Sequence, residues 1–296
     1  ALSKELLDEY RLSLKKKGKK AQANLSTTDN TNPPCTDEEM IVHKLINKQN
    51  KKGDVQDWIG PYKTEMQEVE NRRLTELDDD DITDNIRREA IPLRMILESK
   101  RDGRMKGRLV AIGYKEPTYW DVKSNSSPVV SLSTVRALLF RAGLITDIIS
   151  SVDVSVAFLQ ADPYPDDHPK RYVMYQPDRS IKAKYYLLRG AIYGQRSASR
   201  EWYDTLAGWL ESKGYHKKDD EPCAFINDKG FTVLSYVDDL ICRGSMEETE
   251  KFYELLADKF DCKDYNILSP DNRLAFLGFD ITCEDVDIDD AMIPTE

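Results

Sequence analysis

The chain has 296 residues, of which 40% are hydrophobic and 32% charged, and its formal net charge is −10. This length is enough for one large domain or two smaller ones with their own cores. No apolar run approaches the ~20 residues that cross a bilayer, and the N-terminus lacks the apolar core of a signal peptide. We therefore expect an intracellular protein without a membrane partner. Its five cysteines are far apart and give no zinc-ligand spacing.

Charge is distributed unevenly along the chain. Residues 86–120 hold nine Lys or Arg against four Asp or Glu, whereas residues 236–296 hold five against seventeen. An acidic chain is a poor non-specific nucleic-acid binder, because affinity for phosphates comes from Lys and Arg, but the basic band weakens this objection. Two interpretations stay open: separate regions that bind polyanions and metal cations, or two ordinary solvated faces.

The first ninety residues contain no recognisable site. Residues 1–37 are polar and rich in lysine, so we expect a frayed helix followed by disorder. Residues 38–90 contain two patches with helical spacing and an acidic run, which predict a helical lead-in of unknown role. The informative part of the sequence is residues 91–296.

Strand and helix signals alternate from there. Two extended runs flank Asp102-Gly103, a pair that favours a tight hairpin turn, and Lys106 and Arg108 on the second run would share one face. Apolar residues at helical spacing predict a helix with Ser133 as its N-cap. Residues 150–160 then predict a strand.

A helix, a hairpin and another helix follow. An apolar stripe over residues 198–210, ended by Gly214, predicts the first helix. Residues 231–244 predict two strands joined by a turn, and Ser245 with Glu248 predicts a capping box that opens the last helix. This order is typical of an α+β fold with a mixed or antiparallel sheet packed by helices.

Three aspartates interrupt apolar strands. Asp238 and Asp239 lie between two apolar runs, and Asp153 lies within a third. Aspartates are common in turns, so a purely structural interpretation of the adjacent pair stays open. If the strands are neighbours, however, the three carboxylates converge, and bound divalent cations would offset their repulsion. Mg²⁺ suits such hard oxygen ligands best.

Six sequence blocks occur in a fixed order. They are KGRLVAIGY, SSPVVSLSTVRALL, DVSVAFL, AIYGQRSASREWY, YVDD and FLGFDI. Together they resemble the reverse transcriptase domain of the Pol polyproteins of Ty1/copia-type LTR retrotransposons, over roughly residues 90–283. The resemblance implies a right-hand polymerase, with fingers over residues 91–150 and a palm over residues 151–283.

The resemblance also implies a chemistry. It is RNA-directed DNA synthesis by two-metal nucleotidyl transfer, with two Mg²⁺ ions or Mn²⁺ in their place. Asp153, Asp238 and Asp239 would be the catalytic residues, and Asp153, Asp238 and the carbonyl of Val154 would be the metal ligands.

Eight further positions match substrate-binding positions of the family. Lys106, Arg108, Phe158 and Ser197 would bind the incoming dNTP, with Phe158 excluding a ribose 2′-hydroxyl. Tyr236, Gly194, Gln195 and Arg196 would contact primer and template. Apart from the resemblance, the two basic residues are typical of solvated hairpin charges, and the phenylalanine is typical of a core side chain.

Three positions depart from the family pattern. Gln195 and Ser197 replace the Leu and Gln of its Y-G-L-K-Q segment, and Ile112 replaces an Arg. The thumb and RNase H regions are expected to be largely absent, so a fragment of a polyprotein or a host-retained gene is expected. The alternative is a catalytically silent, decayed or domesticated copy that acts at most as a nucleic-acid-binding module. A nucleotide cyclase, which also uses paired metals, is a third candidate.

Expected partners follow from the resemblance. They are an RNA or DNA template with its primer, dNTPs and the remaining Pol polyprotein domains that lead to DNA integration. The expected location is the cytoplasm or a virus-like particle, with access to the nucleus.

Overall fold

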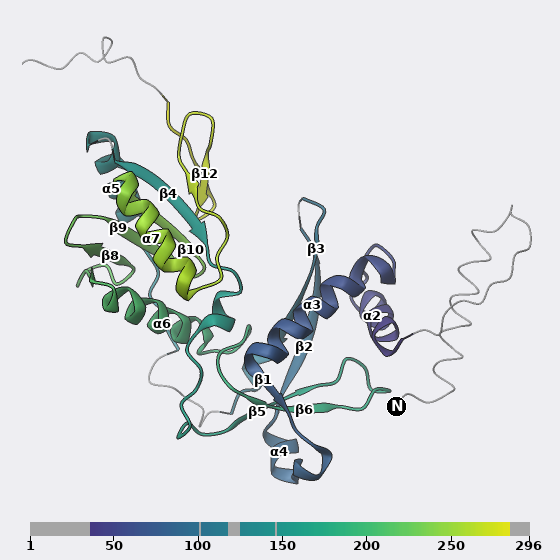
Figure 1. Cartoon of the computed structure of the whole chain (residues 1–296). Helices are drawn as coiled ribbons and strands as arrows, with labels where there is room; N and C mark the ends of the chain where they lie inside the picture. The colour runs from purple at the N-terminus through teal and green to yellow at the C-terminus, as the bar shows by residue number, and fades with distance from the viewer. Residues whose placement is uncertain (1–35, 101, 118–124, 146, 285–296) are drawn as a thin grey trace, which may run out of the picture. The chain divides into compact units, whose positions relative to one another are not determined.

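The computed structural model describes residues 36–100, 102–117, 125–145 and 147–284, and the chain divides into two compact units (Figure 1). Unit 1 holds the residues up to 120 together with 163–196, and unit 2 holds the remainder. Of residues 1–37, predicted to be frayed or disordered, 1–35 lie outside the described residues, and the last two are instead ordered: Thr36 caps a helix that begins at Asp37. The basic band falls in unit 1 and the acidic region in unit 2.

Unit 1 is built on a five-stranded sheet of order β1-β6-β5-β2-β3. Its neighbouring strands are antiparallel except β2 and β5, so the sheet is mixed. The predicted hairpin is confirmed, because β2 and β3 pair on either side of Asp102-Gly103 and Gly103 has φ +83°. The strands are β1 (Leu74–Glu76), β2 (Ile91–Ser99), β3 (Met105–Ala111), β5 (Arg171–Tyr175) and β6 (Lys184–Leu188).

Helices α2 (Asp37–Lys48), α3 (Val55–Arg73) and α4 (Asp84–Glu89) belong to the same unit. The first two confirm the helical spacing seen before residue 90, and each begins at a capping box. Helix α3 runs along β3, where the buried carboxylate of Glu65 accepts the Leu109 N–H at 2.8 Å (Figure 1). The expected lead-in is therefore an integral part of unit 1.

Unit 2 is built on a six-stranded antiparallel sheet of order β11-β4-β10-β9-β8-β7. The predicted hairpin of residues 231–244 is its β9–β10 pair. Both strands are buried at nearly every position, which explains their continuous apolar runs. The strands are β4 (Ile148–Asp153), β7 (Tyr215–Lys217), β8 (Ala224–Asn227), β9 (Thr232–Tyr236), β10 (Asp239–Gly244) and β11 (Asn266–Ile267), with β12 (Leu274–Phe276) and β13 (Phe279–Ile281) as a separate hairpin.

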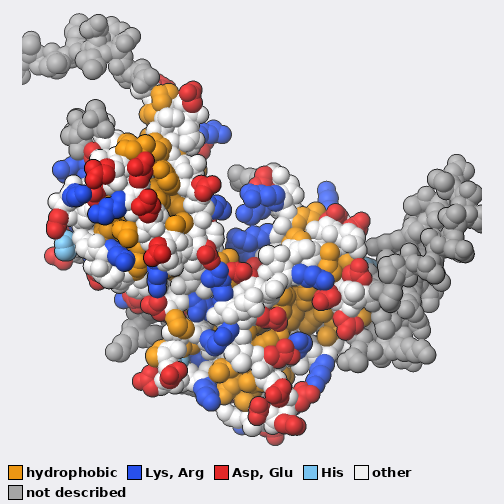
Figure 2. Space-filling model, in the orientation of Figure 1, with side chains coloured by type: hydrophobic (Ala, Val, Ile, Leu, Met, Phe, Trp, Pro, Cys, Tyr) orange, Lys and Arg blue, Asp and Glu red, His pale blue; other side chains and the backbone are white. Residues whose placement is uncertain are grey.

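The three predicted helices are α5 (Leu132–Ile145), α6 (Ala198–Ser212) and α7 (Met246–Lys259). Helices α5 and α7 pack on β4 and β10. The buried rings of Trp209 and Phe260 meet edge to face at 5.3 Å and join α6 to the end of α7. In Figure 2, basic and acidic side chains lie together over the region where Figure 1 draws α7, which is typical of a solvated helix face.

The structure thus confirms the α+β class, with mixed and antiparallel sheets packed by helices, and corrects three local predictions. Ser131, not Ser133, caps α5, because its hydroxyl accepts the Thr134 N–H at 3.1 Å. The strand predicted to reach residue 160 ends at Asp153. The Ser245 hydroxyl caps α7 as expected, but the Glu248 carboxylate accepts hydrogen bonds from Asn227 and Lys229.

Candidate active site

The three aspartates converge in unit 2. Strands β4 and β10 are antiparallel neighbours, and their register sets Asp153 directly opposite Asp239. Asp239 is also opposite Tyr236 across the β9–β10 pair, so Val237 and Asp238 form a two-residue turn. All three carboxylates therefore belong to one end of the central strand pair.

Two hydrogen bonds hold this turn in its strained conformation. Val237 has φ +54°, a strained value for a β-branched residue. The Trp202 indole N–H donates to the Val237 carbonyl at 2.6 Å, and the Val154 N–H donates to the Asp238 carbonyl at 2.7 Å. Trp202 was expected only as a core residue, and it also positions the turn that carries Asp238.

Like charges at this end of the sheet repel one another. The pKa of Asp239 is raised to about 6, first by burial and then by the neighbouring carboxylates of Asp238 and Asp153. The ammonium of Lys263 opposes the shift, and its Nζ lies 2.9 Å from Asp153 Oδ2. The site therefore stabilises bound positive charge.

Asp239→Asn is expected to stabilise the metal-free protein at pH 7.5 by about 1 kcal/mol, after allowance for solvent screening. The folded pKa of Asp239 lies above its ordinary value of 3.8, so the folded state binds the extra proton between pH of about 4 and about 6. Stability of the wild type should fall as pH rises through that window, and this fall should shrink in the variant.

Thermal melts in EDTA across that window measure the effect, which should appear as about 2–4 °C at pH 7.5. Asp271→Asn, at an exposed carboxylate, is the matched control. If the melting temperature of Asp239→Asn fell with pH as steeply as that of the wild type, the Asp239 charge would not be the cause of the fall.

No group of three or more His, Cys, Asp or Glu side chains among the described residues is arranged as a ready-made metal site. One Asp153 oxygen is instead bound by Lys263. The donor chemistry fits Mg²⁺ or Mn²⁺, since carboxylates are hard oxygen ligands. Metal binding at this Asp153 oxygen therefore requires the Lys263 ammonium to move away.

Phe158 lies on a short 3₁₀ helix, η4 (Ala157–Gln160), that follows β4. Val156 has φ +44°, which ends the extended chain and explains why the predicted strand is shorter than expected. Ala157 and Leu159 are buried, whereas Phe158 is half-buried. Phe158 is thus partly accessible, and its assignment to the sugar of a dNTP stays a prediction.

Lys106 and Arg108 lie on β3 in unit 1. They alternate with the buried residues Gly107 and Leu109, which confirms that the two basic residues share a face. Arg108 Nε is 3.8 Å from an oxygen of Glu98, and its guanidinium lies 6.0 Å from the centre of the Tyr193 ring. Glu98 is also opposite Lys106 in the β2–β3 register.

The segment that precedes α6 packs on the end of β3. The Ala111 N–H donates to the Tyr193 carbonyl at 2.7 Å, and Gly194 has φ +84°. The Gln195 side chain accepts the Ile192 N–H at 2.8 Å. In this segment the Gln that replaces the family's Leu is buried and closes its own loop.

The last two residues of the Gln195–Ser197 run differ in their surroundings. Arg196 pairs with Glu116 through Nε at 3.2 Å and donates its backbone N–H to the same carboxylate at 3.0 Å. Ser197 is buried before α6, and its hydroxyl has no hydrogen-bond partner among the described residues. Their predicted contacts with template and dNTP stay predictions.

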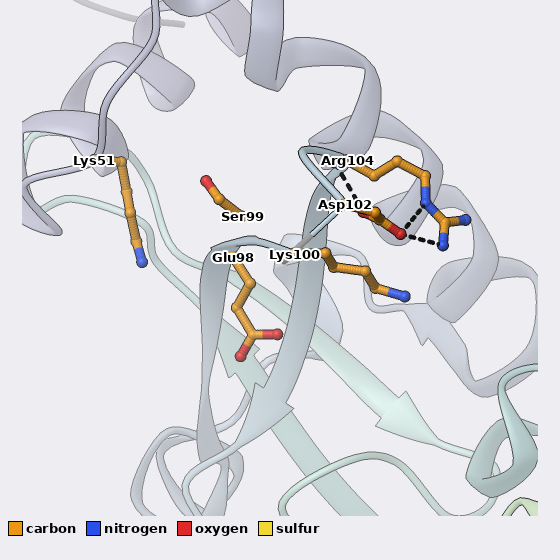
Figure 3. A pocket seen from close by; sticks show the side chains of 6 residues that line it. All are labelled: Lys51, Glu98, Ser99, Lys100, Asp102 and Arg104. Carbon is orange, nitrogen blue, oxygen red and sulfur yellow. Dashed lines mark hydrogen bonds and ion pairs between the residues drawn. The ribbon is translucent and has the colours of Figure 1, made fainter. Parts of the chain in front are cut away.

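A shallow hollow of about 560 Å³ lies at the tip of the β2–β3 hairpin (Figure 3). Its side chains include Lys51, Lys100 and Arg104, and Arg104 turns toward Asp102, which accepts its guanidinium hydrogen bonds at 2.6 and 2.8 Å. Lys106 and Arg108 do not line this hollow.

Comparison with known proteins identifies the family. The model of the reverse transcriptase (RNA-dependent DNA polymerase) family matches residues 81–289. The chain belongs to this reverse transcriptase family. The match includes residues of both units and confirms the resemblance found in the six sequence blocks.

Curated relatives of this reverse transcriptase domain are Pol polyproteins of copia-type elements. The Gag-Pol polyprotein of transposon Ty1-LR2 of Saccharomyces cerevisiae is 27% identical over 257 residues, 83% of this chain and 14% of that protein. The retrovirus-related Pol polyprotein from transposon TNT 1-94 of Nicotiana tabacum is 28% identical over 185 residues, 58% of this chain and 14% of that protein. The chain thus spans a small part of the length of these relatives.

Two solved structures resemble the reverse transcriptase domain more distantly. A foamy viral protease–reverse transcriptase in complex with double-stranded DNA gives a TM-score of 0.44 at 17% identity, over 74% of this chain and 34% of that one. An apo telomerase of Candida tropicalis gives a TM-score of 0.44 at 13% identity, over 78% of this chain and 59% of that one.

Within the described residues, no helix combines the length and the apolar character needed to span a membrane.

Two residues of the candidate site were not predicted from the sequence. Lys263 lies in a segment without strand or helix periodicity, so nothing in its neighbourhood indicated a contact with Asp153. Trp202 was recognised by its helical stripe, which predicts burial but not a hydrogen bond from the indole N–H. Both contacts join segments that are far apart in the sequence, and the spacing of residues along one segment does not show which distant segment lies beside it.

Proposed function

We propose that the chain is a copia-type RNA-directed DNA polymerase that performs nucleotidyl transfer at Asp153 and Asp238. The observation that carries the proposal is the β4–β10 register, which sets Asp153 opposite Asp239 beside the YVDD turn. Membership of the reverse transcriptase family supports it.

Asp153, Asp238 and the carbonyl of Val154 would hold two Mg²⁺ ions, or Mn²⁺ in their place. When bound, such ions supply activation of the primer 3′-hydroxyl and neutralisation of the leaving pyrophosphate. Asp239, at the start of β10, would add negative charge that favours cation binding. The Val237 turn would keep Asp238 at its place relative to Asp153.

The substrates would be bound by further residues. Lys106 and Arg108 on β3 would bind the triphosphate through charge-assisted hydrogen bonds. Tyr236, which is 37% exposed, would lie at the primer terminus. Gly194 and Ser197 would contribute small residues to the dNTP and template contacts. The Gln195 side chain accepts a hydrogen bond within its own loop, whereas the Arg196 side chain is 36% exposed and would contact the template from its ion pair with Glu116.

The proposed setting is that of the relatives. Template, primer and dNTPs are the proposed partners, together with other domains of a Pol polyprotein. The proposed compartments are the cytoplasm, a virus-like particle and the nucleus.

Phe158→Val is expected to raise incorporation of ribonucleotides relative to deoxyribonucleotides by about 10–100-fold, because removal of the ring opens space for the 2′-hydroxyl. Single-nucleotide extension with matched rNTPs and dNTPs measures the ratio. Phe140→Val, at a ring that is 70% exposed on α5, is the matched control. An unchanged ratio in Phe158→Val would remove Phe158 from the sugar site.

Primer extension on an RNA template with dNTPs and Mg²⁺ tests the proposed activity. The proposal expects extension that depends on template, dNTPs and a divalent ion. Binding of primer–template without extension, in Mg²⁺ and in Mn²⁺, would instead support the silent nucleic-acid-binding alternative.

A further inference from the structure

The segment after α7 delivers a cation to the proposed metal ligands. Lys263 Nζ lies 2.9 Å from Asp153 Oδ2, and the Lys263 N–H donates to the Asp153 carbonyl at 3.0 Å. One residue thus binds both the backbone and the side chain of Asp153. The ion pair is partly accessible, with side-chain exposures of 61% for Lys263 and 37% for Asp153.

Neighbouring contacts fix the position of that segment. Ser155 donates its N–H to the Asp261 carbonyl at 2.9 Å, and Val154 forms a β-bridge with Cys262. The Gln160 amide binds Asp261 twice, since it accepts the Asp261 N–H at 2.8 Å and donates to the Asp261 carbonyl at 2.9 Å. The backbone of Lys263 is therefore held beside β4, whereas its long side chain can leave Asp153 without any change of backbone.

We propose that Lys263 is a built-in counter-cation of Asp153 that a divalent ion must displace, so that it sets the metal affinity of the site. The ammonium occupies an oxygen that the proposed function assigns to the metal, and like charges disfavour simultaneous occupation at short range. The ammonium also neutralises part of the repulsion among Asp153, Asp238 and Asp239 in the metal-free protein. This inference rests on the proposed function only in taking Asp153 as a metal ligand.

Mn²⁺ binding to the whole chain, followed by the electron paramagnetic resonance signal of free Mn²⁺ at pH 7.5 without nucleotide, tests the inference. Lys263→Met keeps the length of the side chain and removes its charge, and is expected to bind Mn²⁺ about fivefold more tightly. Lys263→Arg keeps the charge and should bind no more tightly than the wild type. Asp153→Asn in the Lys263→Met background should lose the gain.

Lys218→Met is the matched control. Lys218 is exposed and follows β7, which β8 and β9 separate from β10. Lys218→Met removes the same charge as Lys263→Met. Its affinity for Mn²⁺ should stay within about twofold of the wild type, because exposed charges at a distance are screened. Melts in EDTA check that each variant folds, and Lys263→Gln repeats the test if the Met variant does not.

The outcomes separate this inference from the proposed function. Equal or weaker Mn²⁺ binding by Lys263→Met, or a gain that survives Asp153→Asn, overturns the counter-cation and leaves the polymerase proposal standing. Absence of Mn²⁺ binding in wild type and variant alike overturns both. A tighter site in Lys263→Met supports the inference even where primer extension fails.

Discussion

Asp153→Asn is expected to lower primer extension by about 10³-fold, because loss of one ligand removes several kcal/mol of transition-state stabilisation from a metal-dependent step. Asp238→Asn should have an effect of similar size. Asn has the shape of Asp, and the backbone bond from Lys263 to the Asp153 carbonyl does not involve the side chain. Single-turnover extension on an RNA template, with enzyme in excess of primer, measures the chemical step.

Two controls distinguish loss of a metal ligand from a general effect of the substitution. Asp271→Asn, at an exposed carboxylate, should extend the primer at the wild-type rate. The melting temperature of Asp153→Asn in EDTA should change little, since an ion pair this exposed contributes at most about 1 kcal/mol. Extension by Asp153→Asn at more than about a tenth of the wild-type rate would contradict the assignment of this carboxylate to the metal.

Gly194→Ala is expected to destabilise unit 1 by about 3 kcal/mol or more. Gly194 has φ +84°, and an added Cβ would lie 2.2 Å from the Ala111 carbonyl oxygen. That oxygen belongs to the backbone of β3, so it cannot move aside as a flexible side chain would. The consequence should be loss of the contact between residues 193–194 and the end of β3.

Gly103→Ala is the matched control for this effect. Gly103 has nearly the same φ, +83°, but an added Cβ would have no atom within 4 Å. It should therefore cost only the backbone strain, about 1 kcal/mol. Hydrogen exchange of peptides that cover β3, together with urea unfolding, separates the two variants. Equal stability of both would show that the close approach at Gly194 is not tight in solution.

The sequence predicted those parts of the fold in which apolar residues recur with the spacing of a helix or a strand. Helix α6 was predicted from its apolar stripe, and the β9–β10 hairpin from two apolar runs around the aspartates. Strand β4 was predicted too long, because the positive φ of Val156 has no signature in a run of Val, Ser and Ala. The N-cap of α5 was misassigned because Ser131 and Ser133 are chemically equivalent candidates two residues apart.

The sequence likewise predicted some residues of the candidate site and missed others. The aspartates were recognisable because carboxylates in apolar strands are costly, and the family blocks gave their order. The side chains that stabilise these aspartates come from distant segments, which the sequence does not reveal. Lys263, for example, contacts Asp153 from more than one hundred residues away in the sequence. The structural role of Arg196 also depends on a contact between distant segments, since Arg196 binds Glu116, eighty residues earlier in the chain.

Metal binding by Asp153 and Asp238 is tested most directly by anomalous diffraction from crystals of the chain with primer–template, an incoming dNTP and Mn²⁺. We expect anomalous density for Mn²⁺ bound by the carboxylates of Asp153 and Asp238, with the Lys263 ammonium moved away from Asp153. Ordered primer–template and dNTP without Mn²⁺ at these carboxylates would contradict this expectation.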